Sequence, residues 1–412
     1  MQRLLLSYSQ LPTNTRRLIL GEFFLNILNG SFFMILNIHL ANQGFSDPDI
    51  AGFTAWQYFS VLIAGIPFGL HIRRRSIQPI LRGVALAYPL FAGLLIAFAN
   101  PVYHLLLPVF FVGMGLSISF LRMMAIPYIL RTTDVKFHTH AIALNEISSS
   151  GGTLAAGIMI SLIDFIFPAD DSSIMAMLAF VVLALLSFIV FSFIEKDKSH
   201  LTSNEENPTS SINWGKLGFA LLPTLFIAVG AGLTIPFLNL FFHHVFGLGH
   251  LAFSRISAVS SLLVVIASIS VPYWKERMGF EVASISHLVA ILALIGLACS
   301  ELLLPSAMAL SLAIFFFIIR QPFMVMAGPL TTQVAMYYVG KNNQEMMSAL
   351  HSLIWSGSWF FSSVLFKEMR NRGMPFYSIM FVTVGLYLAG TSLFALLIRR
   401  YKYREQANFN TE

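Results

Sequence analysis

Four charged side chains interrupt long apolar stretches of the sequence: Glu22, Arg122, Glu146 and Arg320. A charge near the centre of a membrane helix costs about 2.5–3.5 kcal/mol on insertion scales, so such a residue usually has a counter-ion or faces water. A buried carboxylate can take up a proton, because burial disfavours its charged form. A buried guanidinium can bind an anionic group. These four residues therefore indicate ion pairing, proton transfer or ligand binding inside a membrane.

Polar residues also gather on one side of several apolar stretches, among them the first and the eleventh. At 100° per residue, Asn26 and Asn29 fall on the same side of the first stretch as Glu22. His351 and Trp355 share one side of the eleventh stretch. Because lipid-facing polar groups are penalised, such stripes are predicted to line an aqueous cavity. We expect substrate contacts from Asn26, Asn29, Arg320, His351 and Trp355, and a proton-coupling or charge network of Glu22, Arg122 and Glu146.

Each of these predictions has a structural alternative. Glu22, Arg122 and Glu146 could form a fixed ion-pair lock within one bundle of helices. Arg320 could be held by helix carbonyls beside a proline, and Trp355 could be ordinary packing. The remaining histidines are expected to be unremarkable: His39, His243, His244 and His250 are predicted to be solvated at helix ends or in loops, and His287 to be a packing residue.

Long apolar helices must position these residues, and the composition is apolar enough to form such helices. Of 412 residues, 57% are hydrophobic and only 11% are charged, and the mean hydropathy is +0.75. A soluble domain needs roughly 25% charged residues to cover its surface. The composition therefore excludes a soluble enzyme, a disordered chain and a nucleic-acid-binding domain. The single cysteine, Cys299, excludes an intramolecular disulfide and a cysteine-based metal cluster.

Twelve stretches are long enough to cross a bilayer, which takes about 20 mainly apolar residues. The sequence thus predicts an all-α integral membrane protein with twelve transmembrane helices. The predicted spans lie near 18–40, 50–72, 78–98, 102–127, 140–163, 174–194, 217–242, 253–274, 282–303, 306–329, 346–366 and 374–398.

The polar segment 195–216 reads as a flexible linker between two halves. We predict an N-terminal six-helix bundle (1–194), a cytoplasmic linker (195–216), a C-terminal six-helix bundle (217–398) and a cytoplasmic tail (399–412). With the N-terminus inside, nineteen of the 25 Lys and Arg residues fall on the cytoplasmic side and four fall outside. We therefore expect the chain to cross the inner membrane of the cell and to have both termini in the cytoplasm. The net charge of +6 then reflects contact with anionic lipid.

Short patterns recur in the same order in both halves. A Leu-Asn pair followed by a glycine occurs in spans one and seven, an arginine followed by a proline in spans four and ten, and Ala-Leu followed by Ser-Gly in spans five and eleven. Their common order predicts two parallel repeats of six helices. The matched residues include Asn37 with Asn239, Arg122 with Arg320, and Ala143 with Ala349, at offsets of 202, 198 and 206.

On these features the chain resembles the major facilitator superfamily along nearly its whole length. That family carries a basic motif, G-x3-D-[RK]-x-G-[RK], after its second span and again after its eighth. Here the first copy has Arg73 at the acidic position, whereas the second has Glu276 there. The corresponding motif residues are Gly69, Arg73 and Arg74 in the first copy and Glu276, Arg277 and Gly279 in the second. The resemblance implies two bundles that rock around a substrate site.

We therefore expect a secondary active transporter that moves a small organic or amphipathic solute by alternating access, coupled to protons. We expect a monomer that is not an enzyme. Its expected partners are a small-molecule substrate and the lipid bilayer, and we expect it to bind no cofactor, resident metal or nucleic acid. A nucleotide-binding Gly-Lys-Ser/Thr loop is absent from the sequence, which disfavours ATP as the energy source. The alternatives are a facilitator without proton coupling, a non-transporting membrane sensor and an integral-membrane enzyme.

Overall fold

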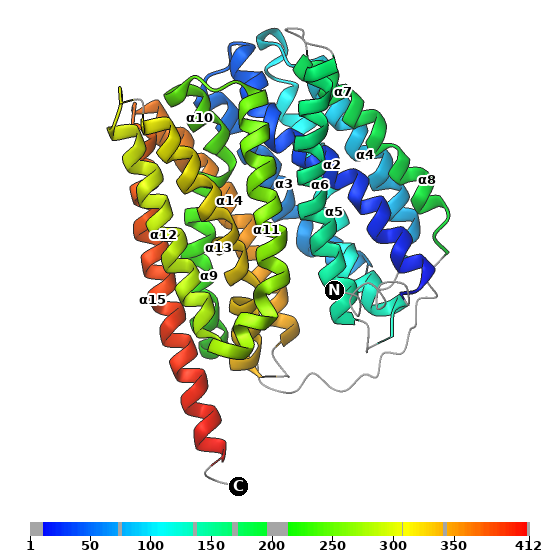
Figure 1. The fold of residues 1–412 in the computed structure, drawn as a ribbon. Coiled ribbons are helices and arrows are strands. Elements are labelled where there is room, and N and C mark those ends of the chain that lie inside the picture. Colours follow the sequence, from blue (N-terminus) through cyan, green and yellow to red (C-terminus); the bar gives the residue numbers. More distant parts are fainter. Residues whose placement is uncertain are drawn as a thin grey trace. The chain divides into compact units, whose positions relative to one another are not determined.

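The computed structural model describes residues 11–72, 76–134, 138–166, 172–195, 213–306, 308–340 and 344–409. Within these ranges every regular element is helical (Figure 1). Arg73, Arg74 and residues 196–212 of the predicted linker lie outside this part, as does the side chain of Glu146.

Six helical segments of the first half coincide with the first six predicted spans. The last of them is made by two consecutive helices, α7 and α8, with a turn at Leu185 between them. The helices are α2 (Thr13–Asn42), α3 (Asp47–Ile72), α4 (Gln78–Ala97), α5 (Leu107–Thr132), α6 (His138–Ile166), α7 (Ser172–Ala184) and α8 (Leu186–Ser192).

The second half repeats this arrangement, and its first span is interrupted by a short 3-10 segment, η3 (Ile235–Phe237), at Pro236. Ten helical stretches across the described residues are long and apolar enough to cross a membrane. The two predicted spans that are not among these ten are also helical and form α3 and α14. The structure therefore agrees with the predicted twelve transmembrane helices. The helices are α9 (Trp214–Thr234), α10 (Leu238–Phe246), α11 (His250–Met278), α12 (Glu281–Leu302), α13 (Met308–Val339), α14 (Gln344–Asn371) and α15 (Phe376–Phe409).

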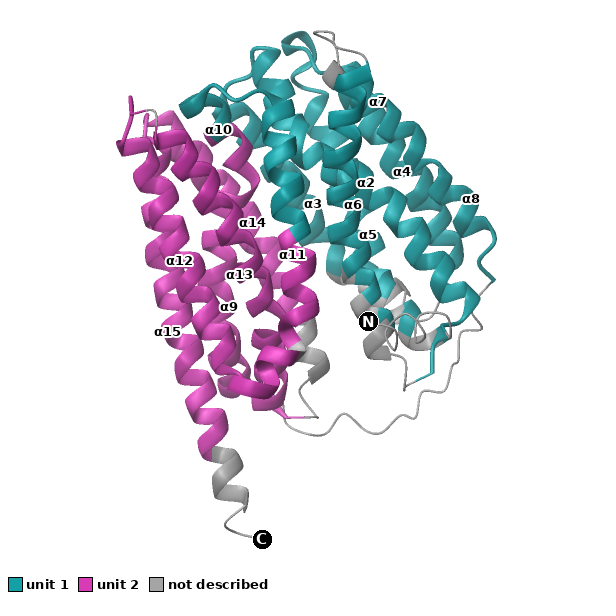
Figure 2. Ribbon diagram, viewed as in Figure 1, with its two compact units in different colours: residues 1–203, 242–262 teal, residues 204–241, 263–412 magenta. Residues whose placement is uncertain are grey.

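The chain folds into two compact units, coloured teal and magenta in Figure 2. In unit 1, α2 packs against α6, α7 and α8, and α5 packs against α3 and α4. In unit 2, α9 packs against α14 and α15, and α12 packs against α13 and α15. The pair α2–α6 thus corresponds to α9–α14, and α4–α5 to α12–α13, which is the repeat that the sequence predicts.

Two glycines show the repeat at the level of atoms. A Cβ on Gly30 of α2 would lie 2.7 Å from the Cα of Thr153 in α6. A Cβ on Gly232 of α9 would lie 3.0 Å from the Cα of Trp359 in α14. The offsets are 232 − 30 = 202 and 359 − 153 = 206, the same as those of the sequence patterns. Only glycine allows backbones to approach this closely, as in other packed membrane helices.

Unit 1 is not continuous in sequence. It contains residues 1–203 and also residues 242–262, which are the end of α10 and the first part of α11. Figure 2 accordingly changes colour within both helices. The packing there is close, since a Cβ on Gly157 of α6 would lie 2.6 Å from the Cβ of Ala258 in α11. The sequence-based division instead assigned this segment to the C-terminal bundle.

Candidate functional site

The polar stripe of α2 is largely covered by other helices of unit 1. Glu22 is 3% exposed and Asn26 is 8% exposed. The backbone and Cβ of Asn26 lie against Gly152 of α6, where an added Cβ would come within 2.8 Å of them. Asn26 therefore takes part in the α2–α6 packing, whatever its side chain binds.

Asn29, one turn further along α2, belongs to a polar cluster. Its Oδ1 accepts a hydrogen bond from the hydroxyl of Tyr88 in α4, at 3.1 Å. Tyr88 and Tyr58 of α3 both lie within electrostatic reach of Arg122. An amide, two phenols and a guanidinium from four helices of unit 1 thus lie near one another, and the hydrogen bond between Tyr88 and Asn29 links α4 to α2.

Arg122 is exposed on the surface of α5, whereas Glu22 is buried. The described side chains contain no ion pair between these two residues, and the side chain of Glu146 is outside that set. The pairing of Arg122 with a carboxylate therefore stays a prediction. An exposed guanidinium within a span must face water or a ligand, because the cost of facing lipid is high.

On α14 of unit 2, His351 and Trp355 lie side by side as their spacing predicts. The indole Nε1 of Trp355 donates to Nε2 of His351 at 3.3 Å, and both residues are half-buried. The ring of Trp359 follows one turn later, with its centroid 6.4 Å from that of Trp355. This arrangement offers an aromatic face beside an imidazole, a suitable surface for a flat or ring-shaped group.

Arg320 occupies a different part of unit 2. It is completely buried, and the hydroxyl of Tyr387 in α15 lies close to its guanidinium. Among the described residues, Nε, Nη1 and Nη2 of Arg320 find no acceptor with good hydrogen-bond geometry. None of the expected substrate residues lies on α15, so this contact was not predicted.

Further polar atoms are gathered near Tyr387. His287 of α12 and Thr391 of α15 line the same narrow gap as Tyr387. Within the described part of the chain, His287 Nδ1 and Thr391 Oγ1 have no hydrogen-bond partner, whereas the Tyr387 hydroxyl lies beside the Arg320 guanidinium. His287 is 4% exposed, in keeping with its predicted packing role. Tyr88 and Tyr387 were missed because a tyrosine within an apolar run carries no signal of what its hydroxyl meets.

The second copy of the basic motif lies at the end of α11. Gly279 has a φ of 65°, a left-handed conformation that ends the helix. Arg277 stacks over Tyr273, with 4.6 Å between the guanidinium carbon and the ring centroid, and Glu276 is exposed. The residue that reaches another helix is Lys275, whose Nζ donates to Oε1 of Gln333 in α13 at 2.6 Å. In the first copy, Gly69 lies within α3.

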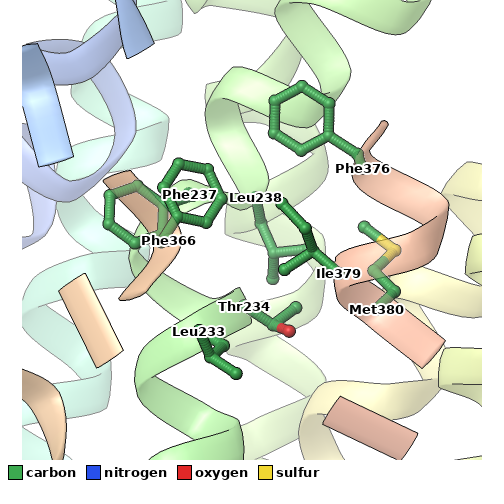
Figure 3. A pocket seen from close by; sticks show the side chains of 8 residues that line it. All are labelled: Leu233, Thr234, Phe237, Leu238, Phe366, Phe376, Ile379 and Met380. Atoms are coloured by element: carbon green, nitrogen blue, oxygen red, sulfur yellow. The ribbon is translucent and has the colours of Figure 1, made fainter. Parts of the chain in front are cut away.

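Unit 2 also contains a small cavity at the interruption between α9 and α10 (Figure 3). Its volume of about 10 Å³ is close to the minimum for one water molecule. The rings of Phe237 and Phe366 stack on one side of it, with centroids 3.7 Å apart. The cavity is too small for an organic solute. Its lining residues are Leu233, Thr234, Phe237, Leu238, Phe366, Phe376, Ile379 and Met380.

The sequence profile of the Major Facilitator Superfamily matches residues 18–363. The chain belongs to this superfamily. Its fold accordingly resembles those of solved transporters of the superfamily. It matches a mutant of the nucleoside transporter NupG with a TM-score of 0.70 at 12% identity, over 93% of this chain and 100% of that one. A search of curated proteins found no match.

Two further solved transporters show the same fold. A D-xylose–proton symporter matches with a TM-score of 0.73 at 12% identity, over 92% of this chain and 96% of that one. A bacterial homologue of the human lysosomal transporter Spinster matches with a TM-score of 0.68 at 14% identity, over 93% and 96%. At this identity the likeness establishes the fold alone and does not identify a solute.

Proposed function

We propose that this superfamily member is a secondary active transporter that moves a small organic solute by alternating access, coupled to protons. The observation that supports it best is the pair of partly open polar surfaces inside spans, one on each repeat. One is the Asn29–Tyr88–Arg122 cluster, and the other is the His351–Trp355 pair. Polar groups at this depth need water or a ligand, which a transport path provides.

In this proposal the flat face of Trp355 stacks on a ring of the solute and His351 binds a polar group on it. Asn26 and Asn29 contribute amide groups from the first repeat. Arg320 supplies positive charge for an anionic group, which its complete burial without a carboxylate partner among the described residues supports. We also propose that the chain acts as a monomer in the inner membrane, with both termini in the cytoplasm.

Glu22 is the proposed proton carrier. It is a buried carboxylate on the polar stripe of α2, one turn before Asn26. Protonation would remove its charge and with it the cost of keeping a carboxylate away from water. Glu146 of α6 is the second candidate, and the superfamily motif at Glu276, Arg277 and Gly279 is proposed to act in conformational change.

Reconstitution in liposomes with an internal pH-sensitive dye tests the proposal. A nucleoside, a pentose and a set of small carboxylates are added outside, and acidification of the lumen is expected with one of these classes. Solute uptake that equalises across the membrane without acidification would instead show a facilitator. A protein that moves no solute of any class, yet keeps a folded melting transition, would favour the sensor or enzyme alternatives.

Matched variants then test the residues. Trp355→Phe should raise the solute KM by up to about fivefold, since stacking on an aromatic face contributes on the order of 1 kcal/mol and the smaller ring keeps part of it. Trp214→Phe is its control, because Trp214 is 62% exposed. Glu22→Gln should abolish solute-driven acidification, whereas Glu368→Gln should not, because Glu368 is exposed and pairs with Arg372 at 2.7 Å. Equal effects of Trp355→Phe and its control would contradict the proposed binding surface.

A further inference from the structure

Arg320 brings a permanent positive charge into the interior of unit 2. Its side chain is fully buried, and Nε, Nη1 and Nη2 find no hydrogen-bond acceptor among the described residues. Arginine keeps its proton in proteins, so burial does not neutralise it. The expected alternative, in which helix carbonyls beside Pro322 hold the guanidinium, finds no support, because none of the three nitrogens bonds to a carbonyl. The charge therefore needs an anionic partner.

The helices that pack against α13 have no carboxylate at the depth of Arg320. These helices are α9, α12, α14 and α15. Arg320 is 12 residues after Met308, the first residue of α13 (320 − 308 = 12), and so about 18 Å into the helix. α9 and α13 contain no Asp or Glu. The acidic residues of α12, α14 and α15 all lie in the first or last turns of these helices: Glu281, Glu301, Glu345, Glu368 and Glu405.

Hydrogen-bond donors from two other helices gather beside Arg320. The Tyr387 hydroxyl lies next to the guanidinium, and Tyr387 also lines a narrow gap together with His287 of α12 and Thr391 of α15. Thr391 follows Tyr387 by one turn, so the two side chains share a face of α15. Nδ1 of His287 and Oγ1 of Thr391 are buried without a partner among the described residues. Hydroxyl groups and an imidazole N–H can all donate to an anion.

His287 differs in this respect from His244 of unit 1. His244 was expected to be solvated, as was His39, yet Nε2 of His244 lies 2.8 Å from Oδ1 of Asp47, and His39 is 5% exposed. Both expectations were wrong because they relied on the position of these residues near helix ends. His287 is buried as expected, but its Nδ1 has no such partner among the described residues. A buried nitrogen of this kind is commonly satisfied by a ligand or a water molecule.

We propose that the guanidinium of Arg320 and the gap beside it form a binding site for one small monovalent anion, either a halide ion or the carboxylate group of a solute. The hydroxyls of Tyr387 and Thr391 and the ring N–H of His287 donate hydrogen bonds to this anion, and Arg320 balances its charge. The halide form goes beyond the proposed function, because a protein that transports nothing can bind an ion. The carboxylate form rests on the proposed function and names the chemical group of the solute that Arg320 binds.

The size of the gap limits which anions fit. As the side chains lie, the gap leaves no room for a water molecule. Met324, one turn after Arg320 on α13, lines it, and an unbranched thioether side chain can rotate out of the way. Tyr387 is held more firmly, because its ring packs against Gly230 of α9, where an added Cβ would lie 2.9 Å from the ring. We therefore expect a single halide ion or a small carboxylate to fit, and a bulkier sulfonate to be excluded.

Equilibrium dialysis with radiolabelled chloride tests the site without any transport. The purified protein is kept in lipid nanodiscs at constant pH and ionic strength, with methanesulfonate as the balancing anion. We expect saturable binding of one chloride ion per protein, displaced by bromide and by formate but not by methanesulfonate. Chloride should also raise the melting temperature, because a ligand that binds only the folded state increases the ratio of folded to unfolded protein by the factor 1 + [L]/Kd.

A transported solute then separates the two sources of the anion. Competition between the solute and chloride would show that the carboxylate of the solute occupies the site, whereas binding of both together would show a resident halide ion. Chloride binding in a protein that transports no solute would reject the proposed function and leave the site standing. Transport without saturable binding of chloride or formate would overturn the site and leave the proposed function standing.

Variants assign the binding to these residues. Arg320→Met should abolish saturable chloride binding, and Tyr387→Phe and Thr391→Val should each weaken it about tenfold, the effect of one hydrogen bond to a charged group. The last two variants keep the charge of Arg320, so they test the site even if Arg320→Met does not fold. The controls are Arg372→Gln, whose side chain is 73% exposed, and Tyr377→Phe, which lies on α15 outside the gap. Chloride binding that is equal in Tyr387→Phe, Thr391→Val and the two controls would overturn the site.

Discussion

Replacing Gly30 by alanine should destabilise the protein, although alanine is the better helix former. The added Cβ would lie 2.7 Å from the Cα of Thr153, whereas ordinary carbon contacts lie at 3.4–4 Å. The backbones of α2 and α6 must therefore separate by about 1 Å, since a Cα atom cannot swing away as a side chain can. Overpacking of this kind typically costs about 1–3 kcal/mol.

Gly232→Ala applies the same perturbation to the second repeat, where the added Cβ would lie 3.0 Å from the Cα of Trp359. It also meets the Cβ of Ser362 at 2.7 Å. Because a Cβ is fixed to its backbone as a Cα is, the nearest atom that cannot swing away lies at 2.7 Å at both positions, and we expect a loss similar to that at Gly30. Gly83→Ala and Gly328→Ala are the controls, because a Cβ at either position meets nothing within 4 Å. These controls should be neutral or gain up to about 1 kcal/mol from helix propensity.

The apparent melting temperature of the purified protein in detergent gives the comparison. We expect a loss of several degrees for both Gly30→Ala and Gly232→Ala and none for the controls, since 1 kcal/mol corresponds to roughly 2–4 °C in a domain of about 200 residues. Equal melting temperatures for all four variants would refute the argument that close backbone contact requires these two glycines.

Three further changes have defined outcomes. Arg320→Met keeps much of the side-chain volume and removes a buried charge that has no carboxylate partner among the described residues. The melting temperature should therefore stay unchanged or rise. Impaired transport at full stability would indicate that Arg320 binds the solute, whereas a large loss of stability would indicate that it supports the fold. Tyr88→Phe should lower stability by about 1 kcal/mol through the lost hydrogen bond to Asn29, as measured by thermal unfolding. Ser203→Cys in a Cys299→Ser background should react with a membrane-impermeant maleimide only in permeabilised cells, and labelling of intact cells would invert the topology.

The sequence predicts the helices better than their contacts, for a physical reason. A membrane helix needs a long apolar run whatever its neighbours are, so the runs alone locate all twelve helical spans. The repeat offsets of 202 and 206 likewise recur in the contacts of Gly30 and Gly232. The interruption at η3 was not predicted as such, although Pro236 removes a backbone donor at that position.

The polar contacts depend on which helices are neighbours and on where along each helix the residues lie. The position of a residue around its own helix gives neither. His351 and Trp355 are four residues apart on one helix, so their contact could be predicted. The contact of Asn29 with Tyr88 crosses from α2 to α4, and that of Arg320 with Tyr387 crosses from α13 to α15. Neither partner could be chosen from twelve tyrosines by sequence alone.

The discontinuity of unit 1 has a consequence for biosynthesis. Its last segment, residues 242–262, leaves the ribosome 59 residues after Ser203, a delay of roughly 3–12 s at ordinary rates of translation. Until then Asp47 lacks its contact with His244, and the face of α6 at Gly157 lacks its contact with Ala258. A nascent chain that stops in the linker therefore presents an incomplete bundle to the insertion machinery. Two halves made as separate polypeptides should accumulate only when both are present in the same membrane.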